Sequence, residues 1–100
     1  MTLKTDIGNN SFDSCMMNAS GVWCSTVDEL EALVKSKAAT FVTKTATLAP
    51  REGNPLPRVH HFGSNSINSS GLPNEGIDYY LAALANFEAT HPDRAFFLSV

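Results

Sequence analysis

The stretch Thr40-Phe41-Val42-Thr43-Lys44 decides the fold class of this chain. β-Branched and aromatic residues in succession favour a β-strand. A helical pattern lies on each side of it: one opens with the capping-box pair Thr26 and Glu29, and the other begins near Ile77 and ends at His91-Pro92. The second pattern has one apolar face, which is expected to be buried and comprises Ile77, Tyr80, Leu81, Leu84 and Phe87. Strands that alternate with helices imply a parallel sheet with right-handed crossovers. We therefore predict an α/β fold.

Two further apolar runs extend the predicted sheet. Residues 15–19 read as a short buried strand, and residues 95–100 read as a third strand. Ahead of them, residues 3–12 alternate around the turn residues Gly8-Asn9-Asn10, which predicts a β-hairpin. No composition shift marks a boundary, so residues 1–100 are expected to form one domain. Because no helix pattern follows the last strand, we predict an incomplete domain. It would be the N-terminal portion of a (β/α)8 barrel, with about three barrel strands and two helices.

Composition narrows the function classes. The net charge is −3 and the pI is about 5.4, and no basic stripe exists to neutralise phosphates, so nucleic acid is not an expected partner. No apolar run reaches the roughly 18 residues of a membrane span, and no signal peptide opens the chain, so the cytoplasm is expected. Cys15 and Cys24 are expected to be free thiols there. The histidines and cysteines lack a zinc-type spacing, so no metal site is predicted.

The stretch Ser64–Asn74 is the strongest candidate for a binding loop. It is rich in Asn and Ser, and it leads directly into the helix that begins near Ile77. Residues 48–76 hold no long periodic element, and an excursion of this size far exceeds the usual two to six residues of a β–α connection. We expect Ile67 and Leu72 to fix the loop to a core, and its small residues to admit a ligand to the backbone.

Three positions near strand ends have the chemistry for a flat anionic ligand. Lys44 ends a strand, where α/β proteins bind ligands, and it can neutralise a carboxylate, a phosphate or a reduced flavin; an ordinary exposed lysine is equally compatible. Ser20 and Gly21 end the preceding strand and can accept a flat ring, or form an ordinary tight turn. The amide of Asn68 suits an imide-like ring, or caps a turn.

Other chemistry-bearing residues have simpler interpretations. His60 and His61 are adjacent on an extended segment, so they point to opposite sides and are expected at the surface. Cys24 has no activating pattern around it and is expected to be a buried thiol. Arg51 and Arg58 either fix the loop through backbone carbonyls or are solvated.

A family resemblance rests on motif blocks that occur in order and at familiar spacing. The blocks are Met17–Val22, Thr43–Thr47, Arg51–Arg58 and Ser66–Asn74. Together they closely resemble the N-terminal third of class 1A dihydroorotate dehydrogenases, the fumarate-linked type. The resemblance implies a (β/α)8 barrel that holds FMN at the C-terminal ends of its strands. It also implies a homodimer that oxidises dihydroorotate to orotate in pyrimidine synthesis, with fumarate as the electron acceptor.

The resemblance also implies roles for individual residues. Flavin-lining residues would be Ala19, Ser20 and Gly21, with Lys44 touching both flavin and substrate and Thr45 following at the cofactor. The substrate side would be Asn68, which hydrogen-bonds orotate, with Ser69 and the backbone of Ser70, Gly71 and Leu72 near the substrate carboxylate. The family's catalytic cysteine belongs to a loop beyond residue 100, so no catalytic residue is assigned here and this chain alone is expected to be inactive.

The chain departs from the family pattern at specific positions. Asn65 stands where the family has Gly, Ser70 stands where it has Met, and residues 59–64 differ from the usual apolar approach to the loop. An alternative interpretation is a non-catalytic remnant or an interaction fragment of the same fold. A weaker one is a pyridine-nucleotide-linked relative, although the Arg51–Arg58 block favours the fumarate type.

Overall fold

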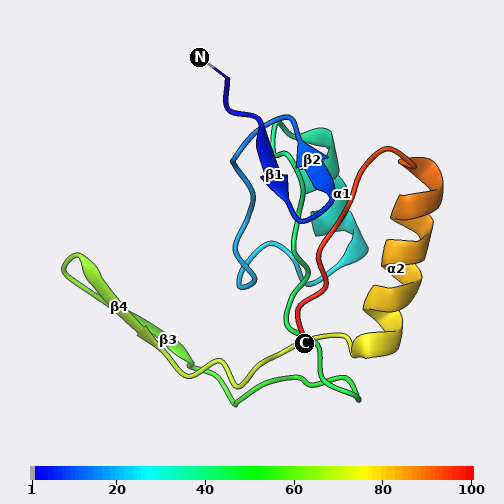
Figure 1. The fold of residues 1–100 in the computed structure, drawn as a ribbon. Helices are drawn as coiled ribbons and strands as arrows, with labels where there is room; N and C mark the ends of the chain where they lie inside the picture. Colours follow the sequence, from blue (N-terminus) through cyan, green and yellow to red (C-terminus); the bar gives the residue numbers. More distant parts are fainter. Residues whose placement is uncertain (1) are drawn as a thin grey trace.

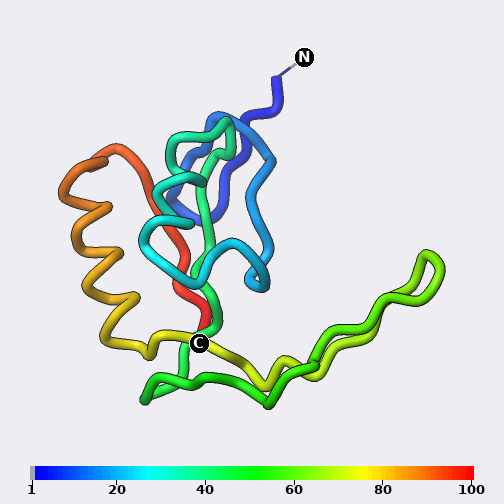
Figure 2. Tube along the Cα trace, turned by 180° about the vertical axis from the view of Figure 1, so that it is seen from behind, coloured from blue at the N-terminus to red at the C-terminus, as the bar shows by residue number. Residues whose placement is uncertain are grey.

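The structure, a computed structural model, describes residues 2–100 and contains mixed strands and two helices (Figure 1). In chain order the elements are β1 (Thr5–Ile7), β2 (Asn10–Phe12), α1 (Val27–Lys35), β3 (Val59–Phe62), β4 (Asn65–Asn68) and α2 (Ile77–Thr90). The strands form two antiparallel hairpins, β1–β2 and β3–β4. Seen from either side, the β3–β4 hairpin extends away from the rest of the chain, as Figure 2 shows. The first hairpin occurs where residues 3–12 predict one.

Helix α1 begins with the predicted capping box. The Thr26 hydroxyl accepts from the Glu29 N–H at 3.4 Å, while the Glu29 carboxylate accepts from the Thr26 N–H at 3.1 Å. These two bonds satisfy donors that a helix start otherwise leaves without partners. Leu30 and Val34 are the buried side chains of α1, so the capping box fixes the end of a helix whose apolar side meets the core.

Helix α2 spans the predicted range and buries the predicted face except at one position, since Ile77 and Leu84 pack against the core. Tyr80 and Phe87 are buried as expected. Leu81, which was predicted to be buried, is 49% exposed, and Ala83 is buried instead. Ala83 lies three residues after Tyr80 and four before Phe87, on one helical face with them, whereas Leu81 lies at the margin. The sequence pattern places Leu81 on the buried face because its side chain is apolar, although its position around the helix axis lies away from Ala83.

The predicted barrel strands are less regular than expected. The segments around Met17, Thr40 to Val42, and Phe97 do run parallel, but they meet through isolated bridges, Met17 to Thr40 and Val42 to Phe97, and none is a full strand in residues 2–100. The segment of residues 15–19 was also predicted to be buried, and this is wrong, because Met16 is 64% exposed and Met17 is 39% exposed. The Met17 segment is bridged to the Thr40–Val42 segment alone among the parallel segments, which leaves its outer side chains uncovered.

The β3–β4 hairpin lies within residues 48–76, for which the sequence pattern predicts a long loop without a periodic element. Val59 pairs with Asn68 and Phe62 pairs with Asn65, around a turn at Gly63-Ser64. A Gly-Ser dipeptide between two four-residue runs is a hairpin signal, and Gly63 has the left-handed φ of +59° that such a turn requires. The expected anchoring by Ile67 and Leu72 is also wrong, because they are 63% and 40% exposed. The hairpin carries Ile67 out into solvent.

The core lies between the Thr40–Ala46 segment and the two helices. The ring of Phe41 stacks on Phe96 at a centroid distance of 4.5 Å and meets Phe87 edge-on at 5.4 Å. Leu30, Tyr80 and Cys24 are fully buried beside them. Full burial of one such large side chain contributes about 1.5–3 kcal/mol. This core therefore holds the end of the Thr40–Lys44 segment in place between α1 and α2.

Candidate functional site

The strand end at Lys44 is the first part of the site. The Nζ of Lys44 donates to the Gly21 carbonyl oxygen at 2.9 Å, and the Lys44 backbone N–H donates to the Cys24 carbonyl oxygen at 2.9 Å. Both acceptors belong to the segment that follows residues 15–19. Lys44 therefore joins two neighbouring segment ends.

Three hydroxyl side chains, one from each of three neighbouring segment ends, form a row of hydrogen bonds near this strand end. Ser20 Oγ donates to the Thr43 carbonyl oxygen at 2.6 Å and lies 3.1 Å from Thr45 Oγ1. Thr45 Oγ1 in turn lies 2.7 Å from Ser99 Oγ. The structure thus brings together Ser20, Gly21, Lys44 and Thr45, while Ala19 lies at the exposed start of the same segment. Ser99 belongs to the same group of hydroxyls. Its position was not predicted, because residues 95–100 contain no motif that indicates a binding role.

The surface beside Gly21 is open to a flat molecule. A Cβ placed on Gly21 would meet no heavy atom within 4 Å, so the backbone is accessible there. The Lys44 ammonium has three N–H donors, and one of them is used by Gly21 in the described residues. Free ammonium donors at an uncovered backbone suit a planar ring with carbonyl oxygens.

The second part of the site is the segment Asn68–Leu72, which starts at the end of β4. Asn68 Oδ1 accepts from the Ser70 N–H at 3.3 Å and from the Ser70 hydroxyl at 3.0 Å. Its amide nitrogen makes no hydrogen bond in residues 2–100, and neither do the backbone N–H groups of Gly71 and Leu72. These donors remain available for a carboxylate or an imide carbonyl. Asn68 and Ser69 are exposed, whereas Ser70 is partly buried.

Residues 51–58 pack tightly against this loop. The Asn54 N–H donates to the Ser70 carbonyl oxygen at 2.9 Å, and the Asn54 side chain donates to the Ser69 carbonyl oxygen at 2.8 Å. A Cβ on Gly71 would lie 2.7 Å from the Asn54 backbone nitrogen, so only glycine permits this approach. Loop geometry is therefore set by backbone contacts rather than by a hydrophobic core.

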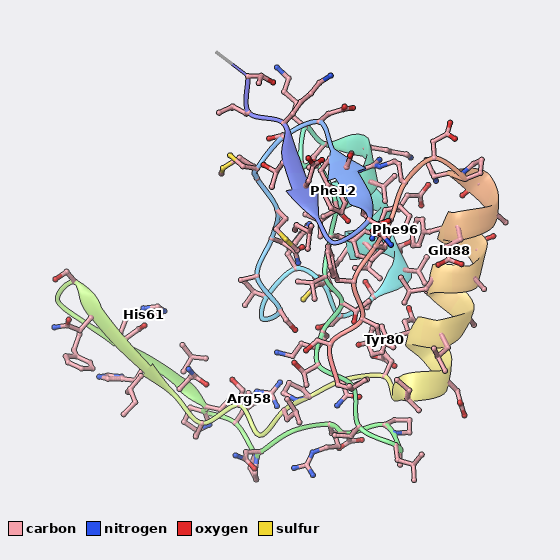
Figure 3. The ribbon with its side chains drawn as sticks, in the orientation of Figure 1. Phe12, Arg58, His61, Tyr80, Glu88 and Phe96 are labelled. Carbon is pink, nitrogen blue, oxygen red and sulfur yellow. The ribbon has the colours of Figure 1, made fainter. Side chains whose placement is uncertain are left out.

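The two arginines of this block donate to backbone carbonyls, which is one of the two predicted alternatives; Arg51 bonds to the loop, and Arg58 bonds to residues of its own block. Arg51 Nε donates to the Gly71 carbonyl oxygen at 3.2 Å. Arg58 Nη1 donates to the carbonyl oxygens of Glu52 and Asn54, at 2.9 and 3.1 Å. Figure 3 shows Arg58 at the base of the hairpin and His61 farther out along it. His60 and His61 are exposed, as predicted.

Asn74 connects the two parts of the site by hydrogen bonds, although its sequence position predicts no role in binding. Within residues 2–100, no hydrogen bond joins Asn68 directly to Lys44. Asn74 is 5% exposed and bonds to Thr47, which follows Lys44 along the chain, and to the carbonyl oxygen of Leu72. The sequence does contain a signal for a structural role. Asn74 lies three residues before Ile77, the first residue of α2, and asparagine is favoured at helix starts.

Other features of the described residues add no further site chemistry. Cys24 is buried, as expected, and Cys15 is exposed; both are free thiols. No group of three His, Cys, Asp or Glu side chains in residues 2–100 is placed to hold a metal ion. Neither helix of this part of the chain is long and apolar enough to cross a membrane. The site is therefore built from one lysine, hydroxyls, amides and backbone N–H groups.

A sequence profile described as "Dihydroorotate dehydrogenase" matches residues 2–100. The chain belongs to the dihydroorotate dehydrogenase family. Its similarity to the probable dihydroorotate dehydrogenase A (fumarate) of Streptococcus pneumoniae is 52% identity over 100 residues, which covers 100% of this chain and 32% of that relative. The dihydroorotate dehydrogenase (fumarate) of Saccharomyces paradoxus is 53% identical over 100 residues, covering 99% of this chain and 32% of that protein.

A third relative matches a shorter range at higher identity. The putative dihydroorotate dehydrogenase A (fumarate) of Streptococcus agalactiae is 58% identical over 81 residues, which covers 81% of this chain and 26% of that protein. Relatives with the fumarate-type name thus occur in bacteria and in yeast. The chain spans about a third of the length of these dihydroorotate dehydrogenases.

Proposed function

We propose that this chain contributes the first part of the flavin and substrate site of a fumarate-type dihydroorotate dehydrogenase. The carrying observation is the Lys44 ammonium, which is held 2.9 Å from the Gly21 carbonyl oxygen, on the two segment ends whose Ser20 and Thr45 hydroxyls lie 3.1 Å apart. Family membership over residues 2–100 supplies the chemical context for this cluster. In this proposal the chain is the N-terminal portion of a (β/α)8 barrel.

The cluster around Lys44 fits FMN in its donor chemistry. Ala19, Ser20 and Gly21 would lie along the flavin ring, since the backbone at Gly21 is uncovered. Lys44 and Thr45 would donate to its polar edge, because a lysine near a ring that gains electrons stabilises the developing negative charge. When bound, FMN would supply the acceptor for the hydride of dihydroorotate, and fumarate would be the final oxidant.

The loop Asn68–Leu72 would bind and orient the substrate. Orotate and dihydroorotate carry a carboxylate and an imide. The free N–H groups of Gly71 and Leu72 would bind the carboxylate, and the Asn68 amide nitrogen would bind an imide carbonyl. Ser69 and Ser70 would complete this edge of the loop. Because Ser70 engages Asn68 through its hydroxyl, its replacement of the family's Met would keep the Asn68 amide oriented.

Residues of this chain would bind and orient FMN and the substrate, and none of them is assigned as the base that removes a proton from the substrate. Cys24 is fully buried in the core, and Cys15 is exposed on the outer segment. We therefore expect no dihydroorotate oxidation by these 100 residues alone, since binding without the base leaves the reaction incomplete.

Chemical-shift mapping of the ¹⁵N-labelled chain tests this proposal. Added FMN is expected to shift the amides of residues 19–21 and 44–45, and added orotate is expected to shift those of residues 68–72. Succinate is the matched control, since it has carboxylates but no imide, and it should leave Asn68 unshifted. Absence of both sets of shifts, or shifts confined to other surfaces, would contradict the proposal.

The β3–β4 hairpin favours a second, non-catalytic role in assembly. Phe62 and Ile67 are 51% and 63% exposed, and in the antiparallel register they share one face with His60, whose ring stacks on Phe62 at 5.9 Å. We propose that this face contacts another polypeptide, which in the family context is a second copy in a homodimer. Light scattering of the chain and of a Phe62→Ser/Ile67→Ser double variant tests it. A mass that is monomeric in both would contradict this role.

A further inference from the structure

Both N–H donors and the oxygen of the Asn74 side-chain amide are hydrogen-bonded, and their partners include residues of both parts of the site. We propose that Asn74 is a positioning residue, which holds the loop Asn68–Leu72 in register with the strand end that carries Lys44. The inference rests on the proposed function, because it assigns these two elements to one binding site. At 5% exposure, Asn74 itself has almost no surface for a ligand.

On one side, Asn74 holds the chain just after Lys44. Its Oδ1 accepts from the Thr47 N–H at 3.1 Å, and its Nδ2 donates to Thr47 Oγ1 at 3.0 Å. The Thr47 hydroxyl donates its single proton to the Ala49 carbonyl oxygen at 2.6 Å, so it is free to accept from Asn74. Thr47 lies three residues after Lys44, so this pair of bonds fixes the path of the chain that leaves the lysine.

On the other side, Asn74 holds the end of the loop. Its Nδ2 donates to the Leu72 carbonyl oxygen at 2.9 Å, and its backbone exchanges two hydrogen bonds of 2.9 Å with Arg51. Leu72 has a φ of +57°, a left-handed conformation that non-glycine residues adopt only when their surroundings impose it. The bond from Asn74 holds this carbonyl, while the neighbouring N–H groups of Gly71 and Leu72 have no hydrogen-bond partner in residues 2–100.

The same amide also starts helix α2. Asn74 Oδ1 accepts from the Gly76 N–H at 2.8 Å, and Gly76 has no side chain with which to cap the helix itself. The amide oxygen thus serves Thr47 and Gly76, while the amide nitrogen serves Leu72 and Thr47. An aspartate at this position would keep both bonds to N–H groups and lose the donors to the Leu72 carbonyl oxygen and to Thr47 Oγ1. The Thr47 hydroxyl can turn its own proton to the carboxylate, whereas the Leu72 carbonyl has no proton to give. The substitution therefore tests the contact of Asn74 with the loop while keeping its contact with the start of α2.

The test compares Asn74→Asp with wild type and with Asn86→Asp, which makes the same chemical change at an exposed position of α2. Orotate and FMN affinities are measured by amide-shift titration. Hydrogen exchange is followed at Thr47, Gly76 and Asn54, whose N–H donates to Ser70 in the loop. The intraresidue amide–Hα NOE of Leu72 reports its left-handed φ. A far-UV circular dichroism melt checks that α2 is intact.

For Asn74→Asp we expect about tenfold weaker orotate binding, unchanged FMN binding, a weaker Leu72 NOE and faster exchange at Asn54. Exchange at Thr47 and Gly76 and the melt should match those of Asn86→Asp. Orotate affinity within twofold of wild type, with the Leu72 NOE unchanged, would overturn the inference. So would equal losses of both ligands in step with a lowered melting temperature, since that is a purely structural effect.

Failure of the proposed function gives a different result. If wild type binds neither orotate nor FMN, the proposed function fails, and Asn74 is judged by its spectroscopic signature alone. Selective loss of the Leu72 NOE with retained protection at Thr47 and Gly76 then supports the positioning role. An unchanged NOE overturns it.

Discussion

Lys44 and Gly21 are joined by a hydrogen bond of 2.9 Å between the lysine ammonium and the glycine carbonyl oxygen. The bond connects the Thr40–Lys44 segment with the chain that follows residues 15–19. It also holds the ammonium at the uncovered backbone of Gly21, the residue that follows Ser20. A single side chain thus carries both a structural contact and the positive charge of the proposed flavin site.

Replacing Lys44 by methionine is expected to lower FMN affinity about tenfold or more. Methionine keeps an unbranched side chain but cannot donate, and a hydrogen bond to a charged group contributes about 1.5–3 kcal/mol. Lys35→Met is the matched control, because that lysine is exposed and pairs with the exposed Glu31 at 3.2 Å. Isothermal titration calorimetry with FMN measures both. Equal affinities for the two variants would argue against Lys44 as a ligand-binding residue.

Much of the helical part of the fold is predictable from local sequence. The Thr26–Glu29 capping box and the limits of α2 depend on residues close in the chain, so their signals are local. The β3–β4 hairpin had an equally local signal in Gly63-Ser64, which was overlooked. The irregular parallel segments were not predictable, because each depends on partners that are distant in sequence. The same reason explains Ser99 and Asn74, whose contacts at the site span 54 and 27 residues.

Gly71 is expected to tolerate alanine poorly compared with Gly63. Both glycines have positive φ, +77° and +59°, which costs an alanine roughly 1–2 kcal/mol in either place. An added Cβ at Gly71 would also lie 2.7 Å from the Asn54 backbone nitrogen, whereas one at Gly63 would meet nothing within 4 Å. Urea unfolding should therefore show a larger loss of stability for Gly71→Ala than for Gly63→Ala.

Amide shifts separate the two glycine variants further. Gly71→Ala should shift the amides of residues 52–54 and 68–72 and weaken orotate binding, while Gly63→Ala should shift only the hairpin turn. Equal stability losses with no loop shifts in Gly71→Ala would show that the close approach of the two backbones does not constrain the loop.

Arg94→Met is expected to destabilise the chain by about 2–3 kcal/mol. The guanidinium donates to the carbonyl oxygens of Val34, Ala38 and Ala39 at 3.0–3.3 Å, and it lies 5.5 Å from the centre of the Phe96 ring. Charged hydrogen bonds to carbonyl groups at a helix C-terminus are among the stronger ones.

Two variants control for the Arg94 prediction. Arg94→Lys should recover only part of the stability, since an ammonium lacks the planar fork that reaches several carbonyls. Lys37→Met, at an exposed position nearby, should change the free energy of unfolding by less than about 0.5 kcal/mol. A Lys37→Met loss as large as that of Arg94→Met would show that charge alone is responsible.

Tyr80 should make the chain less stable at alkaline pH. Its phenol is fully buried, donates to the Ser25 carbonyl oxygen at 2.8 Å and accepts from the Glu75 N–H at 3.3 Å. Burial raises the pKa of Tyr80 above its usual value of 10.0. The unfolded chain therefore loses this proton first, and the stabilisation is complete below pH 10 and declines as the pH rises through the folded-state pKa.

Tyr80→Phe isolates this effect. The variant should be destabilised by about 1–3 kcal/mol at pH 7, because the Ser25 carbonyl and the Glu75 N–H lose a buried partner. Its stability should then fall less steeply than that of wild type between pH 9 and pH 11 in urea unfolding. Parallel profiles for the two proteins would exclude Tyr80 as the titrating group.

An equilibrium titration of the purified chain with FMN tests the central claim most directly. Trp23, the single tryptophan, is 63% exposed and lies two residues after Gly21, so its fluorescence reports binding beside that glycine. The account predicts saturable quenching of Trp23 together with a shift of the flavin absorbance bands, both weakened in Lys44→Met and retained in Lys35→Met. Flavin bands that stay identical to those of free FMN, with no saturable quenching at any concentration, would contradict it.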